Sequence, residues 1–539
     1  MPTPVSNSVT HSNNPLIDGL VFGDEWFFTG PRVLTYSFHD DGGEWDAAEK
    51  QAVRSAFREW ANVANISFQE VSDPHNFRFT HADIAVVASG DALHIKGGFV
   101  GLSYYPFTPN PGYVFNPLGV TYTSSQYPNP QGDIFLDDPE SGTFNLGTFD
   151  YTTILHELGH ALGLKHPHDE PSSFLQLGIG GLDRSELTVM SYNLPINSDR
   201  YSGNQVTPMP LDILAIQYIY GANMHYKTGN NTYLLKDDGM LKTIWDAGGV
   251  DKIDGSGLSA GLVFDMNPGH FNRYAVQSGT AIAYKVIIEK LNATDYADFI
   301  IGNRADNRIH GGGGADALFG GKGDDVLVGN VDNDLLLGQG GQDVLKGGSG
   351  ADLLSGGGRA DVLFGGSGDD VLSGNGGRDR LKGGPDNDSL NGGGGADILQ
   401  GNGGDDVLVF DSKDARVNGG GGVDTLSFTG SGGILNLTRG DHPRYGHLEK
   451  IDLTGTGNNK LVLDIRDVLS LPDHANMFLS DGTRQVLIEG DAGDVVRSTH
   501  QGWVQGTDID IGGIMYTPYT HASIHAQLLV ETDITQHIS

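Results

Sequence analysis

The chain has 539 residues, a formal net charge of -35 and a pI near 4.6. An excess of carboxylates this large repels phosphate polymers and anionic bilayers, so we expect neither a nucleic acid partner nor membrane insertion. Multivalent cations are the natural counterpart. The absence of cysteine excludes disulfides, thiolate metal sites and a cysteine nucleophile, which leaves His, Asp and Glu for metal chemistry.

Residues 1–30 are interpreted as a polar leader or short propeptide. They lack the basic and apolar regions of a secretory signal, and the chain has no run of about 18 apolar residues. If the protein is exported, we therefore expect export without a cleaved N-terminal signal.

Residues 31–225 have the mixed composition of an ordinary globular domain. An amphipathic helix is predicted from Asp46 to Ala64, because Asp46 and Glu49 have the spacing of a capping box. Val53, Phe57, Trp60 and Ala64 fall on one face of it. Strand patterns occupy residues 33–38, 66–71, 82–89, 98–105 and 132–138, and a second helix is predicted to begin near Thr153. This order of elements predicts an α+β domain.

The second helix carries HELGHALGLKH, residues 156–166. His156 and His160 lie one turn apart on one face of a helix, and a left-handed Gly163 would turn the chain so that His166 reaches the same ion. Three imidazoles leave one zinc position for water, and Glu157 is placed to act on that water as general base. The alternative is a set of surface or core histidines that binds no metal.

This extended H-E-x-x-H-x-x-G-x-x-H motif resembles that of the metzincin zinc peptidases. ELTVMSYN, residues 186–193, is similar to their methionine turn, with Met190 beneath the metal; core packing is the plainer interpretation of that methionine. The resemblance implies that Tyr192 is a second catalytic residue, which stabilises the transition-state oxyanion.

Two further segments resemble the serralysin branch of the metzincins. Residues 207–223 are similar to the helix that closes the catalytic domain, and residues 243–254 to the entry into a calcium module. The resemblance implies additional calcium ligands at Asp246, Gly248, Gly249 and Asp251. The sequence KTGNNT, residues 227–232, departs from the family's arginine and aspartate and weakens the neighbouring site.

Residues 311–409 consist of eleven nine-residue units without a gap, with Asp at every sixth position and Leu at every eighth. Six glycine-rich residues make a turn and three make a short strand whose leucine points inward, so stacked units form a solenoid. The stacked carboxylates would repel one another unless a hard cation such as Ca²⁺ lay between them. The expected calcium ligands are Asp316, Asp325, Asp334, Asp343, Asp352, Asp361, Asp370, Asp379, Asp388, Asp397 and Asp406.

The repeat resembles the RTX nonapeptide, which implies a parallel β-roll that folds when it binds calcium. A disordered acidic linker would explain the glycine and the charge, but not the unbroken phase of Asp and Leu. Asp332, Arg359 and Asp386 replace the fourth-position glycine, and Asn307 replaces the aspartate of an upstream unit. Calcium binding is less expected at those turns.

The predicted fold is multidomain. It comprises the metzincin-like domain at 31–225, a connecting region at 226–292, the β-roll at 293–430 and a β-rich region for secretion or capping at 431–539. The last region resembles the ends of RTX proteins exported by type I secretion machinery. We expect a bacterial, extracellular monomer.

The predicted function is that of a calcium-stabilised zinc endopeptidase with one catalytic Zn²⁺ and several structural Ca²⁺. Protein or peptide substrates would be held as an added strand along residues 97–106, with zinc-bound water activated by Glu157 and the oxyanion met by Tyr192. The alternative is a calcium-dependent RTX adhesin or surface protein with a vestigial peptidase domain. An RTX carbohydrate-modifying enzyme would leave the zinc motif unexplained.

Overall fold

The computed structural model describes residues 12–21, 31–39, 45–71, 144–169, 172–193, 204–275, 277–430, 432–439, 444–472, 474–475, 477–480, 482–521 and 523–539, with short strands at 3–5, 25–27, 77–81, 101–103, 114–115, 120–121 and 134–136. It forms two compact units, residues 1–252 with 263–288 and residues 253–262 with 289–539. None of the described helices is long and apolar enough to cross a membrane.

The described helices of the first unit are α1 (Pro15–Asp18), α2 (Ala47–Val63), α4 (Phe149–Ala161) and α5 (Pro210–Tyr220), with a 3-10 turn at Gly180–Leu182. Helix α2 begins at the predicted capping box of Asp46 and Glu49. Helix α4 begins four residues before the predicted Thr153, because the Thr148 side chain accepts a hydrogen bond from the Tyr151 N–H and caps the helix there. The tyrosine and threonines of this first turn are weak helix formers, which hid its start.

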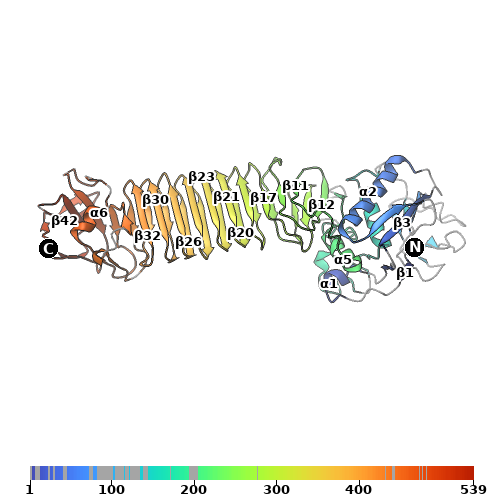
Figure 1. Ribbon diagram of the computed structural model, residues 1–539, viewed down its shortest axis with the longest axis horizontal. Helices are drawn as coiled ribbons and strands as arrows, with labels where there is room; N and C mark the ends of the chain where they lie inside the picture. Colours follow the sequence, from blue (N-terminus) through green and yellow to red (C-terminus); the bar gives the residue numbers. More distant parts are fainter. Residues whose placement is uncertain are drawn as a thin grey trace. The chain divides into compact units, whose positions relative to one another are not determined.

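The main sheet of the first unit has the order β4-β3-β5-β9-β6 among the described strands. Its strands are β3 (Val33–His39), β4 (Ser67–Glu70), β5 (Phe77–His81), β6 (Gly101–Ser103) and β9 (Ile134–Leu136). All pairs are parallel except β6 with β9, so β6 is an antiparallel edge strand. Helix α2 packs on this sheet through Phe57, whose ring lies 4.3 Å from that of Tyr36 (Figure 1). The predicted strand at 82–89 lies outside the described residues.

A second sheet of this unit has the order β10-β12-β16-β15. The remaining strands up to residue 282 are β1 (Thr3–Val5), β2 (Glu25–Phe27), β7 (Val114–Phe115), β8 (Val120–Thr121), β10 (Asn204–Gln205), β11 (Thr232–Leu234), β12 (Met240–Ile244), β13 (Lys252–Asp254), β14 (Val263–Asp265), β15 (Phe271–Arg273) and β16 (Gly279–Ile282). Part of the predicted leader is folded into the unit, since Ile17 and Leu20 are buried and the Leu20 carbonyl accepts a hydrogen bond from the Lys165 N–H.

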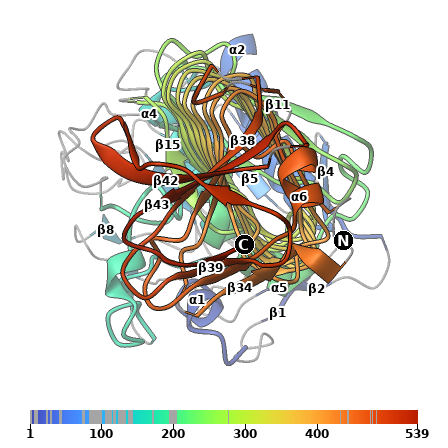
Figure 2. The ribbon, with the colours of Figure 1, turned by 90° about the vertical axis from the view of Figure 1, so that its left-hand side faces the viewer.

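The second unit is a solenoid in which successive strands alternate between two parallel sheets, here called sheet I and sheet II (Figures 1 and 2). Sheet I contains β17 (Lys290–Asn292), β19 (Arg308–Gly312), β21 (Val326–Val331), β23 (Val344–Ser349), β25 (Val362–Ser367), β27 (Arg380–Gly384), β30 (Ile398–Gly403), β32 (Arg416–Gly421) and β35 (Tyr445–Gly446). Sheet II begins with β18 (Phe299–Ile301), β20 (Ala317–Lys322), β22 (Leu335–Gly340), β24 (Leu353–Gly358), β26 (Val371–Gly377), β28 (Ser389–Asn391), β29 (Gly394–Gly395), β31 (Val407–Val409), β33 (Thr425–Ser427) and β36 (Lys450–Asp452).

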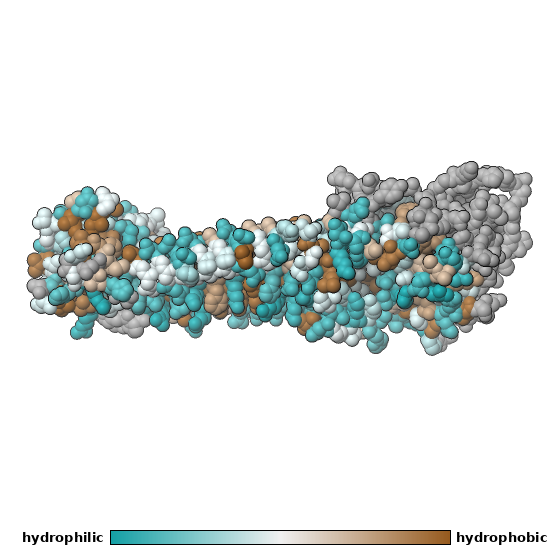
Figure 3. Space-filling view, turned by 90° about the horizontal axis from the view of Figure 1, so that it is seen from above, coloured by the Kyte–Doolittle hydropathy of each residue, from teal (hydrophilic) through white to brown (hydrophobic). Residues whose placement is uncertain are grey.

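The predicted β-roll and its leucine core are confirmed. The eighth-position leucines lie between the sheets and are at most 1% exposed: Leu318, Leu327, Leu336, Leu345, Leu354, Leu363, Leu372, Leu381, Leu390, Leu399 and Leu408. The surface in Figure 3 is instead mostly hydrophilic or near neutral along the solenoid. Residues eighteen apart are strand neighbours, as in the pairing of Leu327 with Leu345. Two columns of buried leucines, one from each sheet, therefore hold the sheets together.

Parallel pairing continues past residue 430 through β36, β38 (Arg484–Glu489) and β43 (Ala526–Glu531). The C-terminal region also contains β34 (Ile434–Asn436), β37 (Lys460–Val462), β39 (Val495–Ser498), β40 (Val504–Gln505), β41 (Ile509–Ile511), β42 (Ile514–Thr520), β44 (Thr535–Ile538) and a 3-10 turn at Leu437–Arg439. The region is β-rich as predicted, with one correction. Residues Ile465–Ser470 form helix α6, because Asp464 caps it and accepts hydrogen bonds from the N–H groups of Arg466 and Asp467.

Candidate functional site

Helix α4 and the turn after it bring three histidines together. The helix is buried on nearly every side, and His156 and His160 project from it one turn apart. It ends in a Schellman motif: the Gly163 N–H donates to the His160 carbonyl and the Leu164 N–H to the Gly159 carbonyl. Gly163 has φ +104°, a conformation that favours glycine, and the reversal returns His166 to the helix as predicted.

The three imidazoles converge through their Nε2 atoms. The Nε2 of His166 lies 3.2 Å from that of His156 and 3.0 Å from that of His160. Each Nδ1 faces an oxygen that can only accept: the Val189 carbonyl at 2.7 Å, the Leu164 carbonyl at 2.9 Å and Asp169 Oδ2 at 2.8 Å. The Nδ1 atoms therefore carry the protons, and three Nε2 lone pairs point at one another.

This donor set fits zinc. Burial, with the neighbouring His166, lowers the pKa of His156 to about 3 and that of His160 well below its usual value, so both rings are neutral. Nitrogens bound tetrahedrally to zinc at ~2.0–2.1 Å lie roughly 3.3 Å apart, close to the spacing here. Lone pairs this close repel unless a cation lies between them, so the arrangement favours a bound metal.

Glu157 and Tyr192 flank the cluster differently. Glu157 follows His156 in the chain and is 6% exposed. Tyr192 is 66% exposed, and its ring stacks on His156 at 5.4 Å and lies 4.6 Å from His166. Desolvation and the charges of Glu157 and Asp169 raise the pKa of Tyr192, so it keeps its hydroxyl proton at neutral pH. One acid and one proton donor thus adjoin the imidazoles.

Met190 lies beneath the helix that carries the histidines. It is fully buried, and a Cβ added at Gly159 would lie 2.6 Å from its sulfur and 3.4 Å from the Trp60 ring. The methionine thus packs where the helix has no side chain. Core packing, the plainer of the two interpretations of Met190, describes this contact.

Asp212, which was not predicted as a site residue, braces the methionine turn. It is buried in the first turn of α5, where its carboxylate accepts hydrogen bonds from the Thr188 hydroxyl at 2.5 Å, the Val189 N–H at 2.7 Å and the Met209 N–H at 2.8 Å. Burial raises the pKa of Asp212 to about 7, although the donors act to lower it. The Val189 carbonyl in turn holds His156, so Asp212 fixes one ligand indirectly. The sequence signal that could have identified Asp212 is a charged residue within an otherwise apolar helix.

Asp169 was also not predicted as a site residue, although it lies three residues after His166. Its carboxylate orients the His166 ring, and the pKa of Asp169 falls below its usual value because the histidine contacts outweigh its desolvation. One carboxylate oxygen of Asp169 and one ring nitrogen each of His166 and the exposed His168 also lie within 4.8 Å of one another. Asp169 therefore selects the His166 tautomer that leaves Nε2 free for a metal.

The sixth-position aspartates form two ladders along the solenoid. In each, an aspartate N–H donates to Oδ1 of the aspartate eighteen residues later, as Asp325 does to Asp343 and Asp343 to Asp361 at 2.8 Å. Their buried Oδ2 atoms have no hydrogen-bond partner among the described residues, and the same holds for Oδ2 of Asp424 and Oδ1 of Asp414. Burial and like-charge neighbours raise their pKa values, to about 8 at Asp316 and about 7 at Asp361. Orphaned carboxylate oxygens of this kind fit calcium.

The irregular units keep the backbone of the repeat. Asp332, Arg359 and Asp386 adopt φ values of +75°, +81° and +77° in place of glycine. Asn307 joins its ladder through its N–H, which donates to Asp325, but its side chain brings no charge. These substitutions change the charge at the turns rather than the path of the chain.

The structure also brings together the residues of the additional predicted calcium site. Asp246 accepts hydrogen bonds from the Gly248 N–H and the Tyr233 hydroxyl, and Asp251 accepts one from the Asn231 N–H. Gly249 has φ +147°, and a Cβ there would lie 2.4 Å from the Gly229 carbonyl oxygen. The segment at 227–232 therefore packs against this site, and calcium binding there stays a prediction.

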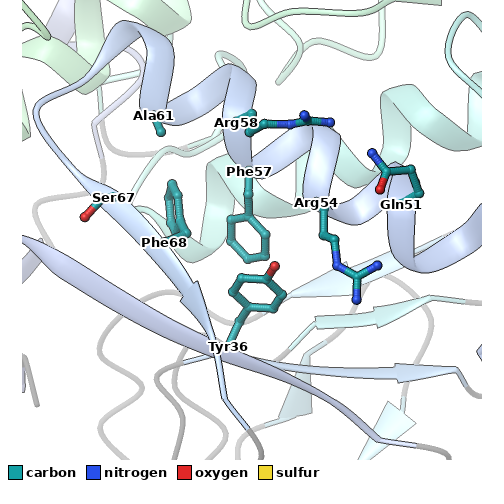
Figure 4. A pocket seen from close by; sticks show the side chains of 8 residues that line it. All are labelled: Tyr36, Gln51, Arg54, Phe57, Arg58, Ala61, Ser67 and Phe68. Atoms are coloured by element: carbon teal, nitrogen blue, oxygen red, sulfur yellow. The ribbon is translucent and has the colours of Figure 1, made fainter. Parts of the chain in front are cut away.

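A separate cavity of about 400 Å³ lies between α2 and strands β3 and β4 (Figure 4). Its lining residues are Tyr36, Gln51, Arg54, Phe57, Arg58, Ala61, Ser67 and Phe68. Arg54 donates to Glu70 at 2.8 Å, and burial together with Glu70 raises the pKa of Tyr36 to about 12. None of the clustered histidines lines this cavity, so it is distinct from the metal site.

Comparison with known families agrees with this description. Residues 26–188 match the family described as Matrixin. The RTX calcium-binding nonapeptide repeat matches at residues 292–327, 319–354, 346–381, 355–390 and 382–412. The chain therefore combines a matrixin domain, whose histidine cluster indicates zinc, with RTX repeats that indicate calcium.

Among individual proteins the chain is similar to serralysins. It is 28% identical to Serralysin G of Dickeya chrysanthemi over 54% of this chain and 63% of that protein. It is 28% identical to Serralysin of Proteus mirabilis, covering 52% and 61%, and 27% identical to Metallopeptidase AprA of Pseudomonas marginalis, covering 52% and 60%. The chain thus spans less than two thirds of the length of these relatives.

Proposed function

We propose that the protein is a secreted, calcium-stabilised zinc endopeptidase of the serralysin type. The observation that carries the proposal is the convergence of three imidazole Nε2 atoms beside a buried glutamate. The matrixin match and the serralysin relatives support the same reaction. We also propose that the protein is an extracellular monomer and that type I secretion machinery exports it.

His156, His160 and His166 would hold the ion, and a bound zinc would supply a Lewis acid and a water of lowered pKa, roughly 7. Glu157 accepts the proton of the attacking water and returns it to the leaving amine. Tyr192, protonated at neutral pH, donates its hydroxyl to the carbonyl oxygen on which negative charge develops. Val189 and Asp169 keep His156 and His166 in the tautomer that the chemistry needs.

Substrate would be bound as an extended strand. Strand β6 has β9 as its single neighbour among the described strands, so its other edge has backbone groups to offer a peptide. Helix α4, which carries His156 and His160, contacts β6. Because strand addition uses main-chain groups, we propose broad side-chain specificity.

The test is digestion of casein by the calcium-loaded full chain, with the variant Glu157→Gln as comparison. The parent protein is expected to cleave casein and to lose activity when zinc is chelated while calcium is kept. Glu157→Gln is expected to lower kcat by about 10²-fold or more while zinc content is unchanged, because the general base is lost and the ligands remain.

An inactive parent protein that holds one equivalent of zinc would refute the proposal. That outcome would favour the calcium-dependent adhesin with a vestigial peptidase domain. A matched control is Glu49→Gln, which makes the same change at an exposed helix terminus and is expected to leave casein cleavage unaffected.

A further inference from the structure

Sheet I carries a row of cations on its outer surface. Lys346, Phe364 and Lys382 are register partners on neighbouring strands, and Arg380, Ile398 and Arg416 form the adjacent column. The four cationic side chains are exposed. They are named here the basic face: Lys346, Arg380, Lys382 and Arg416.

The basic face has a regular spacing. Neighbouring strands of a sheet lie ~4.7–4.9 Å apart, so Lys346 and Lys382 are separated by roughly 9.6 Å, as are Arg380 and Arg416. Phe364 lies between the two lysines, is 38% exposed and has the Lys346 Nζ 6.0 Å from its ring centroid. Two lines of cations thus run across the strands, with an aromatic ring in one of them.

No ion pair of the described residues involves the basic face. The outward positions of β23 to β32 contain no Asp or Glu, and Arg359 and Arg378 add exposed cations to the adjoining turns. The outward positions of sheet II from β24 to β31 carry no charge at all. Four exposed cations without a carboxylate partner, in a chain of net charge -35, indicate an anionic ligand.

We propose that the basic face binds an extended acidic polysaccharide, whose carboxylate or sulfate groups pair with the cations while a sugar ring packs on Phe364. The polymer runs across the strands, parallel to the two lines of cations. This inference goes beyond the proposed peptidase activity and does not depend on it. A polysaccharide attached to a surface would hold the protein there.

The charge distribution favours a narrow and sparsely charged polymer. Duplex DNA carries one negative charge per ~1.7 Å, far denser than the cation spacing, and most of its phosphates would face an acidic chain. A flat anionic bilayer would also approach the exposed aspartates of the turns, such as Asp324, Asp369 and Asp405, and be repelled by them. A single polysaccharide strand touches the basic face alone.

The experiment measures binding of the calcium-loaded full chain to immobilised polygalacturonate, with uncharged dextran as reference. The wild type is expected to bind polygalacturonate and not dextran, with an affinity that falls as salt is added. The basic-face variant, Lys346→Gln, Arg380→Gln, Lys382→Gln and Arg416→Gln together, is expected to bind roughly 10-fold more weakly or worse. Phe364→Ser, which keeps every charge, is expected to weaken binding by a smaller factor.

A matched variant removes two lysines and two arginines from exposed positions elsewhere: Lys236→Gln, Lys285→Gln, Arg466→Gln and Arg497→Gln. It is expected to bind like the wild type. Equal losses in the two variants, or absence of polygalacturonate binding, would overturn the proposal. So would binding confined to duplex DNA or to phosphatidylglycerol vesicles in parallel measurements. Calcium-dependent circular dichroism equal to that of the wild type verifies that each variant is folded.

Discussion

The Asp212 carboxylate receives three hydrogen bonds, and two of the donors, Thr188 and Val189, belong to the methionine turn beside the histidines. An asparagine there offers one oxygen and turns an NH₂ group toward a donor. Asp212→Asn is therefore expected to destabilise the first unit by roughly 1–3 kcal/mol, because a buried N–H or hydroxyl loses its acceptor. Urea unfolding and zinc content measure the effect, and zinc content should fall with stability.

Asp238→Asn is the matched control for this substitution, since Asp238 is exposed and pairs with Lys242 at the surface. It is expected to change stability by less than about 0.5 kcal/mol. If the two variants unfold at the same urea concentration and hold equal zinc, Asp212 does not brace the site.

At the level of single residues, local chemistry was predictable and distant partners were not. His156, His160, Gly163 and His166 lie within eleven residues, so helix geometry alone could bring them together. Asp212 reaches Val189 across 23 positions, and no spacing rule connects them. The tautomers of the histidines depend on such distant partners, and only the folded structure identifies these partners.

The α1 segment supports the turn that carries His166. The Leu20 carbonyl accepts a hydrogen bond from the Lys165 N–H, and Val21 bridges to Leu164, whose carbonyl holds the His160 ring. Deletion of residues 1–21 is expected to weaken zinc affinity by roughly 10-fold or more, because support of a ligand is lost. Competition with a zinc-binding dye provides the measurement.

The comparison for this deletion is removal of residues 1–11 alone, which leaves α1 in place. It should retain the zinc affinity of the full chain. Equal affinity in both truncated proteins would mean that the segment covers the turn without supporting it.

The aspartate ladders make the β-roll sensitive to pH when calcium is absent. The pKa of Asp316 rises from 3.8 to about 8, and that of Asp361 from 3.8 to about 7. Between a pH near 3.8 and a pH near these raised values, the calcium-free folded roll therefore binds more protons than the unfolded chain. Its stability is therefore greatest at acidic pH and falls as the pH rises through that window. Calcium binds the ionised form and competes with protons.

The calcium concentration needed to fold the roll is consequently expected to be higher at about pH 6 than at about pH 8. Calcium-depleted full chain, titrated with calcium while far-UV circular dichroism is followed, gives the two midpoints. A titration with magnesium serves as the reference, since its octahedral preference suits these turns poorly. Midpoints that do not move with pH would contradict proton competition at the ladders.

At the level of elements, regularity decided what could be predicted. The nine-residue repeat predicted the strands, the buried leucines and the stacking of the units, because each unit contacts only its neighbours. Helix α6 was taken for strand, since IRDVLS is short and rich in branched residues. The start of α4 was hidden for a similar reason, because its first turn is favoured by the Thr148 cap and not by propensity.

For the molecule as a whole, net charge does not say where the charges lie. The value of -35 predicted repulsion of nucleic acids and anionic membranes, and part of this negative charge lies in the aspartate ladders that calcium would neutralise. From β23 to β32 the solenoid presents four exposed cations on sheet I, and from β24 to β31 the outward positions of sheet II are uncharged. Composition gives the sum of the charges, and only the register of the strands gives their arrangement.

The ladders also have a direction. The N–H of each ladder aspartate donates to a side chain of a later coil, and the last acceptor of one ladder is Glu449, which receives the Asp424 N–H at 3.0 Å. The N–H of a sixth-position aspartate therefore has its acceptor only when the next coil is in place, whereas the following N–H donates to the preceding coil, as that of Val344 does to the Asp325 carbonyl. Each inner coil is thus tied to both of its neighbours, and a coil at the end of the roll needs a substitute partner, which Glu449 supplies after the last aspartate of its ladder.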